Sequence, residues 1–387
     1  MSLDDDVRGE LAALEAAHRL RVPRIVDGMQ GPVATVDGQA VLNFASNDYL
    51  GLAGDPRLIR AASAALEAGG TGVGASRLIV GNHREHVRLE ADVADWMRCP
   101  GVRLFNAGYA ANVGVLTALL RAGDVVFSDE LNHASIIDGC RLSRAEIAVF
   151  PHRDLAALAG LLEARRGPRR IVVSESLFSM DGDLADVEAI AALCKRHGAG
   201  FVLDEAHAVG VFGPEGRGLA ADHGVVPDVV IGTFGKALGG FGAFAASSRP
   251  VADLLWNRAR SLVFSTGLPP SIPAAARAAI EIVRGREGDH RRAALAGHAR
   301  RLRTLVPQIG GGATSAIGPV VLGDDRVAMR CMARLLELGV LVQGIRPPTV
   351  PRGTSRLRIC MSSAHTDEHM NIAGEALDNV LRLEASS

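Results

Sequence analysis

Hydrophobic positions in the middle of the chain fall into short continuous runs, separated by longer segments with helical spacing. In chain order the runs are VRLF, DVVFSD, AEIAVF, RIVVSES, GFVLDEAH and DVVIGT. Their β-branched content is typical of buried strands. Between most of them lie helical patterns such as DLAALAGLLEARR and DVEAIAALCKRHG. Because continuous apolar strands that alternate with helices are typical of a parallel sheet covered on both faces, the pattern predicts an α/β fold with a mostly parallel sheet.

The two ends of the chain follow other patterns. Residues 4–20 have the spacing of an amphipathic helix, and a proline-containing arm, RVPRIVDG, precedes a predicted β-hairpin that turns at Asp37 and Gly38. A single long Ala- and Arg-rich helix is expected from about Pro270 to Val306. An α+β pattern follows it, from IGPVVLG to a last helix.

These patterns predict a division into three parts. We expect an N-terminal helix, arm and small β segment over residues 1–50, and a large α/β domain over residues 51–285. A smaller C-terminal α+β domain is expected over residues 286–387.

Composition narrows the class of protein. Of the 387 residues, 48% are hydrophobic and 22% are charged, as in soluble globular proteins. The formal net charge is −1 and no dense Lys/Arg cluster occurs, so we expect no nucleic-acid partner. The start, MSLDDDVRGE, lacks the apolar core of a signal peptide, and no run of about 18 apolar residues predicts a membrane span. We therefore expect a cytoplasmic protein without a membrane contact.

Neither the cysteines nor the histidines form a metal-binding pattern. The five cysteines contain no C-x-x-C pair, which fits free, mostly buried thiols better than a disulfide or zinc framework. The stretch HREH, from His83 to His86, lacks the H-E-x-x-H spacing of zinc enzymes, and we expect it to be a solvated turn. No bound metal is predicted.

Small and polar residues follow the predicted strands. In open α/β sheets ligands bind beyond the carboxyl ends of the strands, so these positions are the first candidates for a site. The residues are Gly108 and Tyr109, His133, Ser179, Asp204 with His207, and Thr233 with Lys236.

Lys236 is the most informative of them. It stands in PDVVIGTFGKALGGFGAF among five glycines, with no other charge between Asp228 and Arg249. A buried amine is costly unless it is paired or neutralised. A lysine in this setting therefore indicates chemistry that needs an amine.

Each of the other residues also has a structural interpretation. A carboxylate or hydroxyl after a strand is often the N-cap of the next helix, and a single histidine is often part of a satisfied core. The residues open to this interpretation are Asp204, Ser179, Thr233, His133, His207 and, as a packing residue, Tyr109.

A pyridoxal phosphate site would account for the whole set. Such a site needs a lysine to hold the aldehyde and move protons, and a carboxylate to keep the pyridine nitrogen protonated, which suits Asp204. His133 is available to cover the ring, and His207 to bond the phenolic oxygen. The phosphate needs hydroxyls and N–H groups at a helix N-terminus. Its candidates are Gly108, Tyr109, Ser179 and Thr233.

Several longer motifs carry a family resemblance. They are SNDYLGL from Ser46, GTGVGASRLIVGNHREHVRLE from Gly70, NAGYAAN, LNHAS, SLFSMDGD, LDEAHAVGVFGPEGRG and TFGKALGGFGAF. Together they resemble the α-oxoamine synthases over residues 20–370. These are fold-type-I pyridoxal-phosphate transferases, dimers that condense an amino acid with an acyl thioester and release carbon dioxide. The resemblance implies a large domain with a mostly parallel sheet between helices and a smaller α+β C-terminal domain.

The resemblance also implies roles for the candidate residues. Lys236 would carry the cofactor as a Schiff base and Asp204 would pair with the pyridine nitrogen, while His133 would stack on the ring and His207 would contact the phenolic oxygen. The residues around cofactor and phosphate would be Gly108, Tyr109, Ser179 and Thr233. Because the family places its sites at the dimer interface, STGLPP resembles the segment that reaches the neighbour's phosphate, through Ser265 and Thr266.

One segment distinguishes branches of the family. IRPPTVP resembles the branch that makes 8-amino-7-oxononanoate, a biotin precursor, from L-alanine and a pimeloyl thioester. The branches that form aminolevulinate or use glycine usually carry Tyr-Pro before the Val-Pro. By this resemblance the substrate would contact Asn47, His133 and Thr349, and its carboxylate would pair with Arg358. Arg21 falls where the family places a substrate-contacting arginine, and Arg24 is an equal candidate by charge.

The sequence also argues against other classes of protein. No G-x-G-x-x-G stands between a first strand and helix, which argues against a dinucleotide-dependent dehydrogenase. GTFGKA lacks the spacing and the Ser/Thr of a P-loop. A degenerate, inactive subunit is disfavoured because Lys236, Asp204, His133 and His207 occur together. Glycine- or serine-using members of the family stay open, as does the acyl carrier, acyl carrier protein or coenzyme A.

Overall fold

The computed structural model describes residues 2–385 and divides into two compact units. The larger unit contains residues 48–179 and 183–293. The smaller unit contains residues 2–47, 180–182 and 294–385. The N-terminal segment thus shares a unit with the C-terminal part of the chain.

The larger unit alternates strands and helices along the chain. Its strands are β4 (Gly101–Phe105), β5 (Val125–Asp129), β6 (Glu146–Phe150), β7 (Arg170–Glu175), β8 (Gly200–Asp204), β9 (Val229–Thr233) and β10 (Ala243–Ser247). Its helices are α2 (Pro56–Gly69), α3 (Arg84–Met97), α4 (Gly108–Leu119), α5 (Ala134–Ser143), α6 (Leu155–Ala164), α7 (Val187–His197), α8 (Leu219–Asp222), α9 (Arg249–Arg258), α10 (Arg260–Val263) and α11 (Ser271–Arg284), with a 3₁₀ turn, η1 (Pro214–Gly216).

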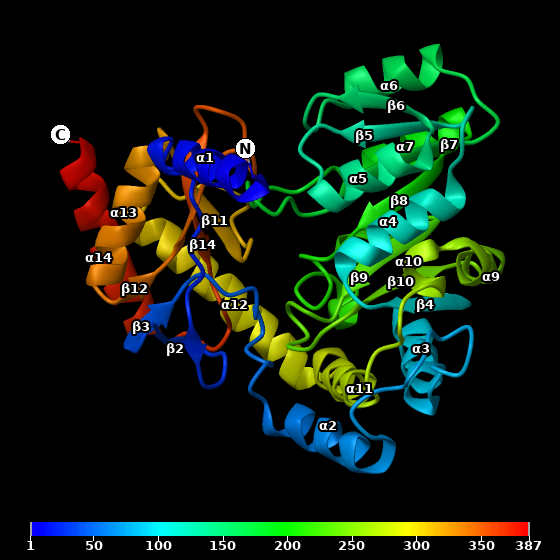
Figure 1. Cartoon of the computed structure of the whole chain (residues 1–387), viewed down its shortest axis with the longest axis horizontal. Coiled ribbons are helices and arrows are strands. Elements are labelled where there is room, and N and C mark those ends of the chain that lie inside the picture. The colour runs from blue at the N-terminus through cyan, green and yellow to red at the C-terminus, as the bar shows by residue number, and fades with distance from the viewer. Residues whose placement is uncertain (1, 386–387) are drawn as a thin grey trace. The chain divides into compact units, whose positions relative to one another are not determined.

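These strands form one seven-stranded sheet in the order β4-β10-β9-β8-β7-β5-β6 (Figure 1). Neighbours from β9 to β6 pair in parallel, and β10 pairs antiparallel with β4 and β9. Every residue of β5, β9 and β10 is buried. Because successive side chains of a strand point to opposite faces, the sheet is covered on both faces, which confirms the predicted fold class.

Helices on one side of this sheet form its main core. α4 packs against β4, β9 and β10, and α9 and α10 pack against α4. Val115 of α4, Ile231 of β9 and Leu255 of α9 belong to the same buried hydrophobic cluster. Burial of apolar surface contributes about 25 cal/mol per Å² to stability, and this packing helps to hold the strand ends in place.

The predicted single helix between Pro270 and Val306 is two helices. α11 ends at Arg284 and α12 (Arg286–Leu305) begins one residue later, because Gly285 takes an extended conformation with φ −88° and ψ 178°. The carbonyl of Gly285 accepts the N–H of Asp289 at 3.2 Å, as expected of the residue before a helix. The prediction of one continuous helix was therefore wrong at this glycine.

The smaller unit has two sheets. Its strands are β1 (Val26–Asp27), β2 (Val33–Val36), β3 (Gln39–Asn43), β11 (Ile317–Gly323), β12 (Val340–Leu341), β13 (Gln343–Ile345) and β14 (Ser355–Cys360), and its helices include α13 (Asp325–Glu337) and α14 (Asp367–Ala385). One sheet has the order β1-β2-β3-β12 and the other β11-β14-β13. The predicted hairpin is confirmed, because Asp37 and Gly38 between β2 and β3 have φ of 49° and 82°.

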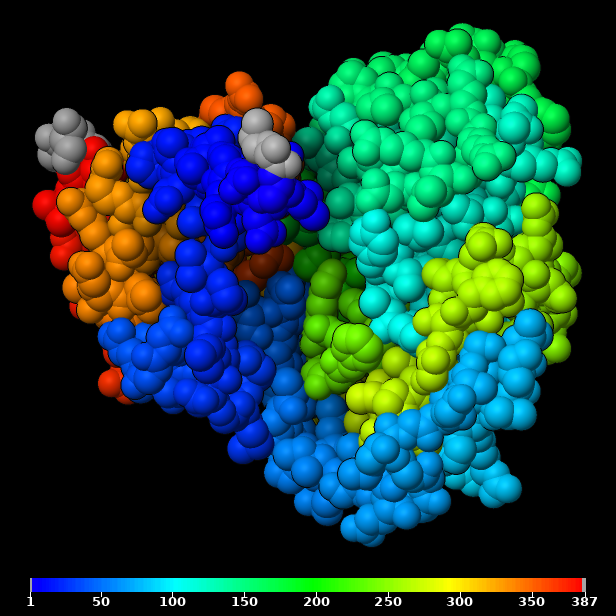
Figure 2. Space-filling model, in the orientation of Figure 1, coloured from blue at the N-terminus to red at the C-terminus, as the bar shows by residue number. Residues whose placement is uncertain are grey.

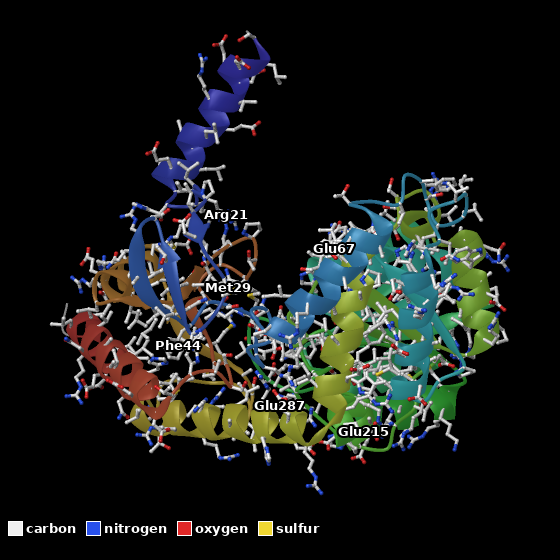
Figure 3. The ribbon with its side chains drawn as sticks, turned by 90° about the horizontal axis from the view of Figure 1, so that it is seen from below. Arg21, Met29, Phe44, Glu67, Glu215 and Glu287 are labelled. Carbon is white, nitrogen blue, oxygen red and sulfur yellow. The ribbon has the colours of Figure 1, made fainter. Side chains whose placement is uncertain are left out.

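Helix α1 (Leu3–Ala16) is shorter than the predicted helix over residues 4–20. It ends because His18 has a φ of 56°, which a right-handed helix does not allow. All of its residues are exposed, and it lies in full view in dark blue (Figure 2). Arg21 follows in the arm that leads to β1 (Figure 3).

The expected solvated turn at HREH is also wrong. His83 is the N-cap of α3, and the ring of His86 is fully buried with Nε2 2.8 Å from the carbonyl of Leu268. Burial lowers the pKa of His86 to about 4, so the ring is a neutral core group. The prediction failed because a capping histidine and a polar turn have the same local sequence.

The described residues contain neither a membrane-spanning helix nor a metal-binding cluster. Over residues 2–385, none of the helices is both long and apolar enough to cross a membrane. Within the same range no group of three or more His, Cys, Asp or Glu side chains could hold a metal ion. The five cysteines are free thiols, and all except Cys99 are buried, as the sequence predicts.

Candidate active site

A cavity of about 180 Å³ lies at the carboxyl ends of β4, β5, β7, β8 and β9. It belongs entirely to the larger unit. Its lining consists of Gly108, Tyr109, Asn112, His133, Ser135, Glu175, Asp204, Ala206, His207, Thr233 and Lys236. The seven predicted residues Gly108, Tyr109, His133, Asp204, His207, Thr233 and Lys236 are thus brought together at the predicted edge of the sheet.

Lys236 lies half-buried in the loop between β9 and β10. Its Nζ atom is 2.7 Å from Nε2 of His207. The glycines around it serve close packing: a Cβ on Gly239, which has a φ of 64°, would lie 2.4 Å from the backbone of Leu52 and Ala53. The glycine-rich sequence therefore lets the lysine loop approach another backbone segment, and the lysine itself faces the cavity.

His207 has a second partner on its other ring nitrogen. Nδ1 is 2.7 Å from the hydroxyl oxygen of Tyr49, whose side chain is fully buried. Tyr49, His207 and Lys236 thus form a continuous hydrogen-bonded row that ends at the cavity. Tyr49 was not among the predicted residues, although it lies within the quoted motif SNDYLGL.

Asp204 is buried, with its carboxylate fixed by two donors. Oδ1 accepts the N–H of Ala206 at 2.8 Å, which is the N-cap-like bond of the structural interpretation. Oδ2 accepts Nδ2 of Asn112 at 2.6 Å. The sequence reasoning missed Asn112. It lies four residues after Gly108, one helical turn further along the same face of α4, and this spacing is the signal that could have found it.

The same amide connects Asp204 to His133. Nδ2 of Asn112 also lies 3.0 Å from Oγ of Ser135, and that oxygen is 2.7 Å from Nδ1 of His133. Nδ1 of His133 accepts the backbone N–H of Ser135 at 3.2 Å, so His133 is the N-cap of α5. Burial lowers the pKa of His133, against the neighbouring charge of Asp204, which raises it.

Glu175, the last residue of β7, is a further lining residue that the sequence reasoning missed. Burial, followed by the Asp204 carboxylate, raises the pKa of Glu175 to about 8. Its carboxyl accepts the backbone N–H groups of His133 and Ser179, which lower that pKa. It therefore ties together the two loops that follow β5 and β7.

Three predicted cofactor residues lie outside the lining. Ser179 is buried and bonded to Glu175 through its backbone. The side chain of Asn106 donates to Oγ of Ser265 and to the carbonyl of Thr266, each at 2.9 Å. Thr233 lines the cavity, but its hydroxyl donates to the carbonyl of Gly242 at 2.9 Å, as a loop-fixing residue does.

Of the predicted substrate residues, His133 lines the cavity of the larger unit, and the other four lie in the smaller unit. Nη2 of Arg358 donates to Oδ1 of Asn47 at 3.1 Å, and the arginine is only 6% exposed. Nη2 of Arg21 lies 3.4 Å from Oγ1 of Thr349. These four residues thus form two contacting pairs within that unit.

A second cavity contains the Arg21–Thr349 pair. It has a volume of about 560 Å³ and is lined by Leu20, Arg21, Val22, Pro23, Arg24, Asp37, Met329, Met332, Gln343, Gly344, Ile345, Arg346 and Thr349. Among the described residues, Nε of Arg346 and Nη1 of Arg24 are buried without a hydrogen-bond partner. Unpaired guanidinium nitrogens in a cavity indicate a site for an anion.

Comparison with known proteins gives the family. Residues 39–377 match the family model described as aminotransferase class I and II. Curated 8-amino-7-oxononanoate synthases are similar over almost the whole chain. That of Pelobacter propionicus is 46% identical over 382 residues, covering 97% of this chain and 98% of the relative. That of Anaeromyxobacter dehalogenans is 49% identical over 366 residues, covering 93% and 92%. The chain belongs to the 8-amino-7-oxononanoate synthase family.

Solved structures share the fold. A serine palmitoyltransferase from S. paucimobilis with a bound PLP–myriocin aldimine has a TM-score of 0.93 and 31% identity, with 99% of this chain and 98% of the other covered. An 8-amino-7-oxononanoate synthase from Francisella tularensis has a TM-score of 0.76 and 26% identity, with 89% and 99% covered. The fold is that of the fold-type-I transferases, and the protein is an acyltransferase of the pyridoxal-phosphate-dependent kind.

The cavity at the strand ends fits that cofactor. Among the described residues, Oδ1 of Asn112 and Oε1 of Glu175 are buried polar atoms without a partner. α4 begins after Ala107 without a side-chain cap, so its first N–H groups suit a phosphate. A Cβ on Gly108 would meet no described atom within 4 Å, so the cradle is open. An amine, a carboxylate and an uncapped helix start are the groups that pyridoxal phosphate requires.

Proposed function

We propose that the protein condenses L-alanine with a pimeloyl thioester, releasing carbon dioxide and a thiol, to give 8-amino-7-oxononanoate for biotin synthesis. The observation that carries the proposal is the convergence of Lys236, His207, Asp204 and His133 on one cavity. Curated 8-amino-7-oxononanoate synthases that are 44–49% identical to this chain support the choice of substrates. The carrier of the acyl group, acyl carrier protein or coenzyme A, is not part of the proposal.

The residues of the cavity would divide the work of holding the cofactor. Pyridoxal phosphate supplies an aldehyde that captures an amino acid and a protonated ring that stabilises negative charge at its Cα. Lys236 would hold the aldehyde and Asp204 would pair with the ring nitrogen. Gly108 and Tyr109, at the start of α4, would present N–H groups to the phosphate.

Lys236 would also move the substrate proton. A neutral amine can take the Cα proton of L-alanine, and the Nε2 atom of His207 at 2.7 Å can exchange a proton with Nζ. His133, whose pKa is lowered by burial, would offer a neutral ring to the reacting groups. The cavity thus contains both a base and a polar partner for it.

The bonds balance with one proton taken from solvent, because the proton removed from Cα accounts for the thiol. Cα of alanine loses a proton and forms a C–C bond to the thioester carbonyl carbon, and the C–S bond breaks to release the thiol. The alanine carboxylate then leaves as carbon dioxide, and Cα takes up a proton.

The arginines of the smaller unit would bind the two carboxylates of the substrates. Arg358, buried and oriented by Asn47, would pair with the carboxylate of the amino acid. The cavity with Arg21, Arg346 and Thr349 would take the acyl chain and its distal carboxylate, because Met329 and Met332 provide an apolar wall beside the unpaired guanidinium nitrogens.

The protein would act as a homodimer. Ser265 and Thr266 resemble the segment that reaches the neighbour's phosphate in the family, and they lie outside the cavity of their own chain. A sedimentation measurement that finds only monomers in the active protein would exclude this part of the proposal.

A second candidate is condensation with L-serine. The structural relatives with the highest similarity given above are serine palmitoyltransferases, with a TM-score of 0.93 against 0.76 for the oxononanoate synthase. The solved oxononanoate synthase is 26% identical to this chain, below the 31% of the serine palmitoyltransferase, but curated oxononanoate synthases reach 46–49%. Because side chains rather than backbone geometry select the amino acid, the identity carries more weight for the substrate.

The visible absorption spectrum of the purified protein tests the proposal. With pyridoxal phosphate added, L-alanine, glycine and L-serine are titrated separately. We expect the cofactor band to respond to L-alanine at a much lower concentration than to the others. A stronger response to glycine or serine would keep the reaction type and change the product. The absence of any band would mean that the chain does not use Lys236 as proposed.

A further inference from the structure

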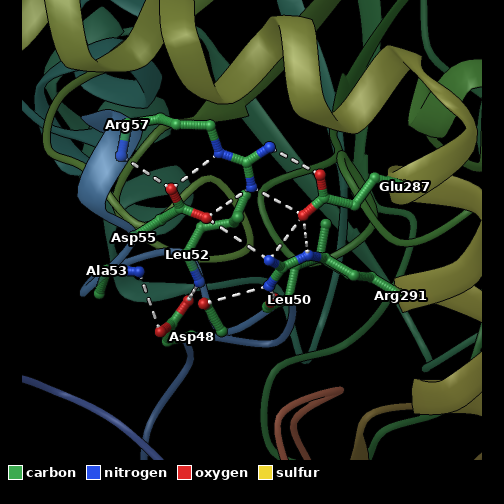
Figure 4. Close-up of polar contacts among 9 residues, drawn as sticks. Asp48, Leu50, Leu52, Ala53, Asp55, Arg57, Glu287 and Arg291 are labelled. Atoms are coloured by element: carbon green, nitrogen blue, oxygen red, sulfur yellow. Dashed lines mark hydrogen bonds and ion pairs between the residues drawn. The ribbon is translucent and has the colours of Figure 1, made fainter. Parts of the chain in front are cut away.

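The segment that carries Tyr49 is held at both sides. Nη1 of Arg291 donates to the carbonyl of Leu50 at 2.6 Å and to that of Gly51 at 3.3 Å (Figure 4). The carboxyl of Asp48 accepts the N–H groups of Leu52 at 2.8 Å and Ala53 at 3.1 Å. The backbone on either side of Tyr49 is therefore fixed by hydrogen bonds.

Arg291 is itself fixed by a group of charged side chains (Figure 4). Glu287 lies within 2.8 Å of Arg291 and 2.7 Å of Arg57, and Arg57 lies 2.7 Å from Asp55. Hydrogen bonds from Arg57 lower the pKa of both Asp55 and Glu287 to about 2. The carboxylates thus stay charged at neutral pH and the network persists.

The result is a rigid path from the start of α12 to the lysine. Arg291 holds Leu50 and Gly51, Tyr49 lies 2.7 Å from Nδ1 of His207, and Nε2 of His207 lies 2.7 Å from Nζ of Lys236. Gly239 in the lysine loop packs on the backbone of Leu52 and Ala53. The phenol is fully buried, so its ring has little freedom to turn away.

We propose that Tyr49 is a positioning residue: its hydroxyl donates to Nδ1 of His207, so that Nε2–H points at Lys236 and the amine is kept neutral. A ring nitrogen that accepts a hydrogen bond carries no proton, so the proton of a neutral imidazole must then lie on Nε2. An Nε2–H donor needs the lone pair of Nζ as acceptor, and an ammonium group has none.

The other charged and titratable groups at the site belong to different elements. Asp204 at the end of β8, Glu175 at the end of β7 and His133 at the start of α5 line the same cavity. A positive charge on Lys236 would lower the pKa of Glu175 and of His133, so both groups respond to the protonation of the amine. Tyr49 differs from these three because it does not line the cavity and reaches Lys236 only through the imidazole ring of His207.

Replacing Tyr49 with phenylalanine tests this inference, which rests on the proposed role of Lys236. The chain contains only two lysines, Lys195 and Lys236. The K195R variant therefore has Lys236 as its single lysine, and it serves as the parent protein for the other variants in this experiment. The rate of pyridoxal phosphate uptake by cofactor-free protein is followed by absorbance from pH 6 to 10. Borohydride reduction and mass spectrometry then count the cofactor fixed to the chain.

In Y49F we expect uptake at pH 7 to be about three- to tenfold slower, the scale of one net hydrogen bond. Without the phenol the proton can move to Nδ1, and Nε2 then accepts a hydrogen bond from a lysine ammonium, which does not attack an aldehyde. At pH 10 the rates of Y49F and the parent should converge. A role of Tyr49 in packing alone would lower the melting temperature and leave the pH profile unchanged.

The matched control is S143A, because Ser143 is a buried hydroxyl of the larger unit that donates to the carbonyl of Cys140 at 2.6 Å rather than to a histidine, and it does not line the cavity. It should keep the pH midpoint of uptake. Equal profiles for Y49F and the parent would overturn the inference about Tyr49. Fixation of cofactor by K236A would instead overturn the proposed function, so the two failures are distinguishable.

A second measurement applies if Y49F does not fold. Biosynthetic 3-fluorotyrosine gives two ¹⁹F resonances, which Y109F assigns. We expect the Tyr49 resonance to move when pyridoxal phosphate is added, and this response to vanish in His207→Phe. The inference would be contradicted if the Tyr49 resonance did not shift when pyridoxal phosphate is added, or if it shifted equally in His207→Phe.

Discussion

Nδ2 of Asn112 donates to Oδ2 of Asp204 at 2.6 Å, and the same nitrogen reaches Oγ of Ser135 at 3.0 Å. Through Ser135, the carboxylate expected to serve the cofactor ring is connected to His133. One amide at the second turn of α4 therefore orients two of the predicted catalytic side chains. The amide oxygen has no partner among the described residues, which leaves it available to a ligand.

Replacing Asn112 with alanine should lower kcat about tenfold to hundredfold, because a carboxylate that can turn no longer faces the cofactor ring in one orientation. The loss of two buried hydrogen bonds should also cost about 1–2 kcal/mol of unfolding free energy. Steady-state kinetics and thermal unfolding measure the two effects. Ser135→Ala, which keeps the bond to Asp204, is the matched control and should affect kcat less. Unchanged kcat in Asn112→Ala would show that Asp204 needs no orienting partner.

Replacing Lys236 with alanine should abolish turnover, by a factor on the order of 10⁴ or more, because no other amine lies in the cavity lining. Lys195 is exposed in the last turn of α7 and serves as the control, since Lys195→Ala removes the only other lysine. Borohydride trapping followed by peptide mapping should find the cofactor on Lys236 alone. Near-normal kcat in the Lys236 variant would contradict the proposed role of Lys236 in holding the cofactor and moving the substrate proton.

Replacing Asp204 with asparagine should slow proton removal from alanine by about a hundredfold or more, while cofactor binding changes less. The neutral amide can still bond the cofactor ring nitrogen but no longer stabilises its positive charge. Exchange of the alanine Cα deuteron with solvent, followed by NMR, reports the proton step, and absorbance reports occupancy. Normal exchange at full occupancy would remove Asp204 from the role of electrostatic partner.

His152 should make the stability of the larger unit depend on alkaline pH. Its Nδ1 lies 3.0 Å from Asp129 and its Nε2 2.9 Å from Asp183. Although burial lowers it, these two bonds raise the pKa of His152 to about 10. A pKa raised above the unfolded value of about 6.5 contributes stability that is complete below that pH and is lost as pH rises through about 10.

His152→Gln should therefore lower the unfolding free energy by about 3 kcal/mol at pH 6, and by much less above pH 10. Urea unfolding at both pH values measures the difference. His197→Gln, at the end of α7, is the control for removing a histidine. An equal loss at both pH values would mean that His152 is neutral in the folded protein.

Arg346→Gln should raise KM for the acyl thioester about tenfold to hundredfold, because a charged hydrogen bond to a carboxylate is lost. KM for L-alanine should stay within about twofold, since Arg358 is untouched. Arg334→Ala removes a half-buried arginine on α13 that pairs with Glu384 and does not line this cavity, and it controls for the loss of one positive charge. A parallel rise of both KM values would indicate a general disturbance rather than an acyl subsite.

Much of the fold follows from local pattern. Each of the strands β4 to β9 lies where an apolar run predicts it, because burial on both faces keeps most positions of the central strands apolar. The helix break at Gly285 was missed since a glycine within a helical pattern is often tolerated, and only its extended backbone separates α11 from α12. Tertiary packing, rather than propensity, decides such a position.

The residues of the candidate site also fall into those that the sequence predicts and those that it does not. Residues directly after strands, such as Asp204 and Lys236, are predictable because topology brings strand ends together. Tyr49 is not, since its partner His207 lies 158 residues away and no local spacing reveals the contact. Asn112 and Glu175 were missed although Asn112 lies one helical turn after Gly108 and Glu175 is the last residue of β7. The groups that touch ligands are therefore easier to find by sequence than the groups that orient them.

The side chain of His133 has two roles, because it lines the cavity and also caps helix α5. Its Nδ1 accepts the N–H of Ser135 and so begins α5. A proton placed on that nitrogen would displace the helix N–H, and an N-cap is worth about 1 kcal/mol. Acidification would therefore charge the ring only by loosening the first turn of α5. If His133 acts as proposed, the loss of its neutral ring in acid and the fraying of this helix would be the same event.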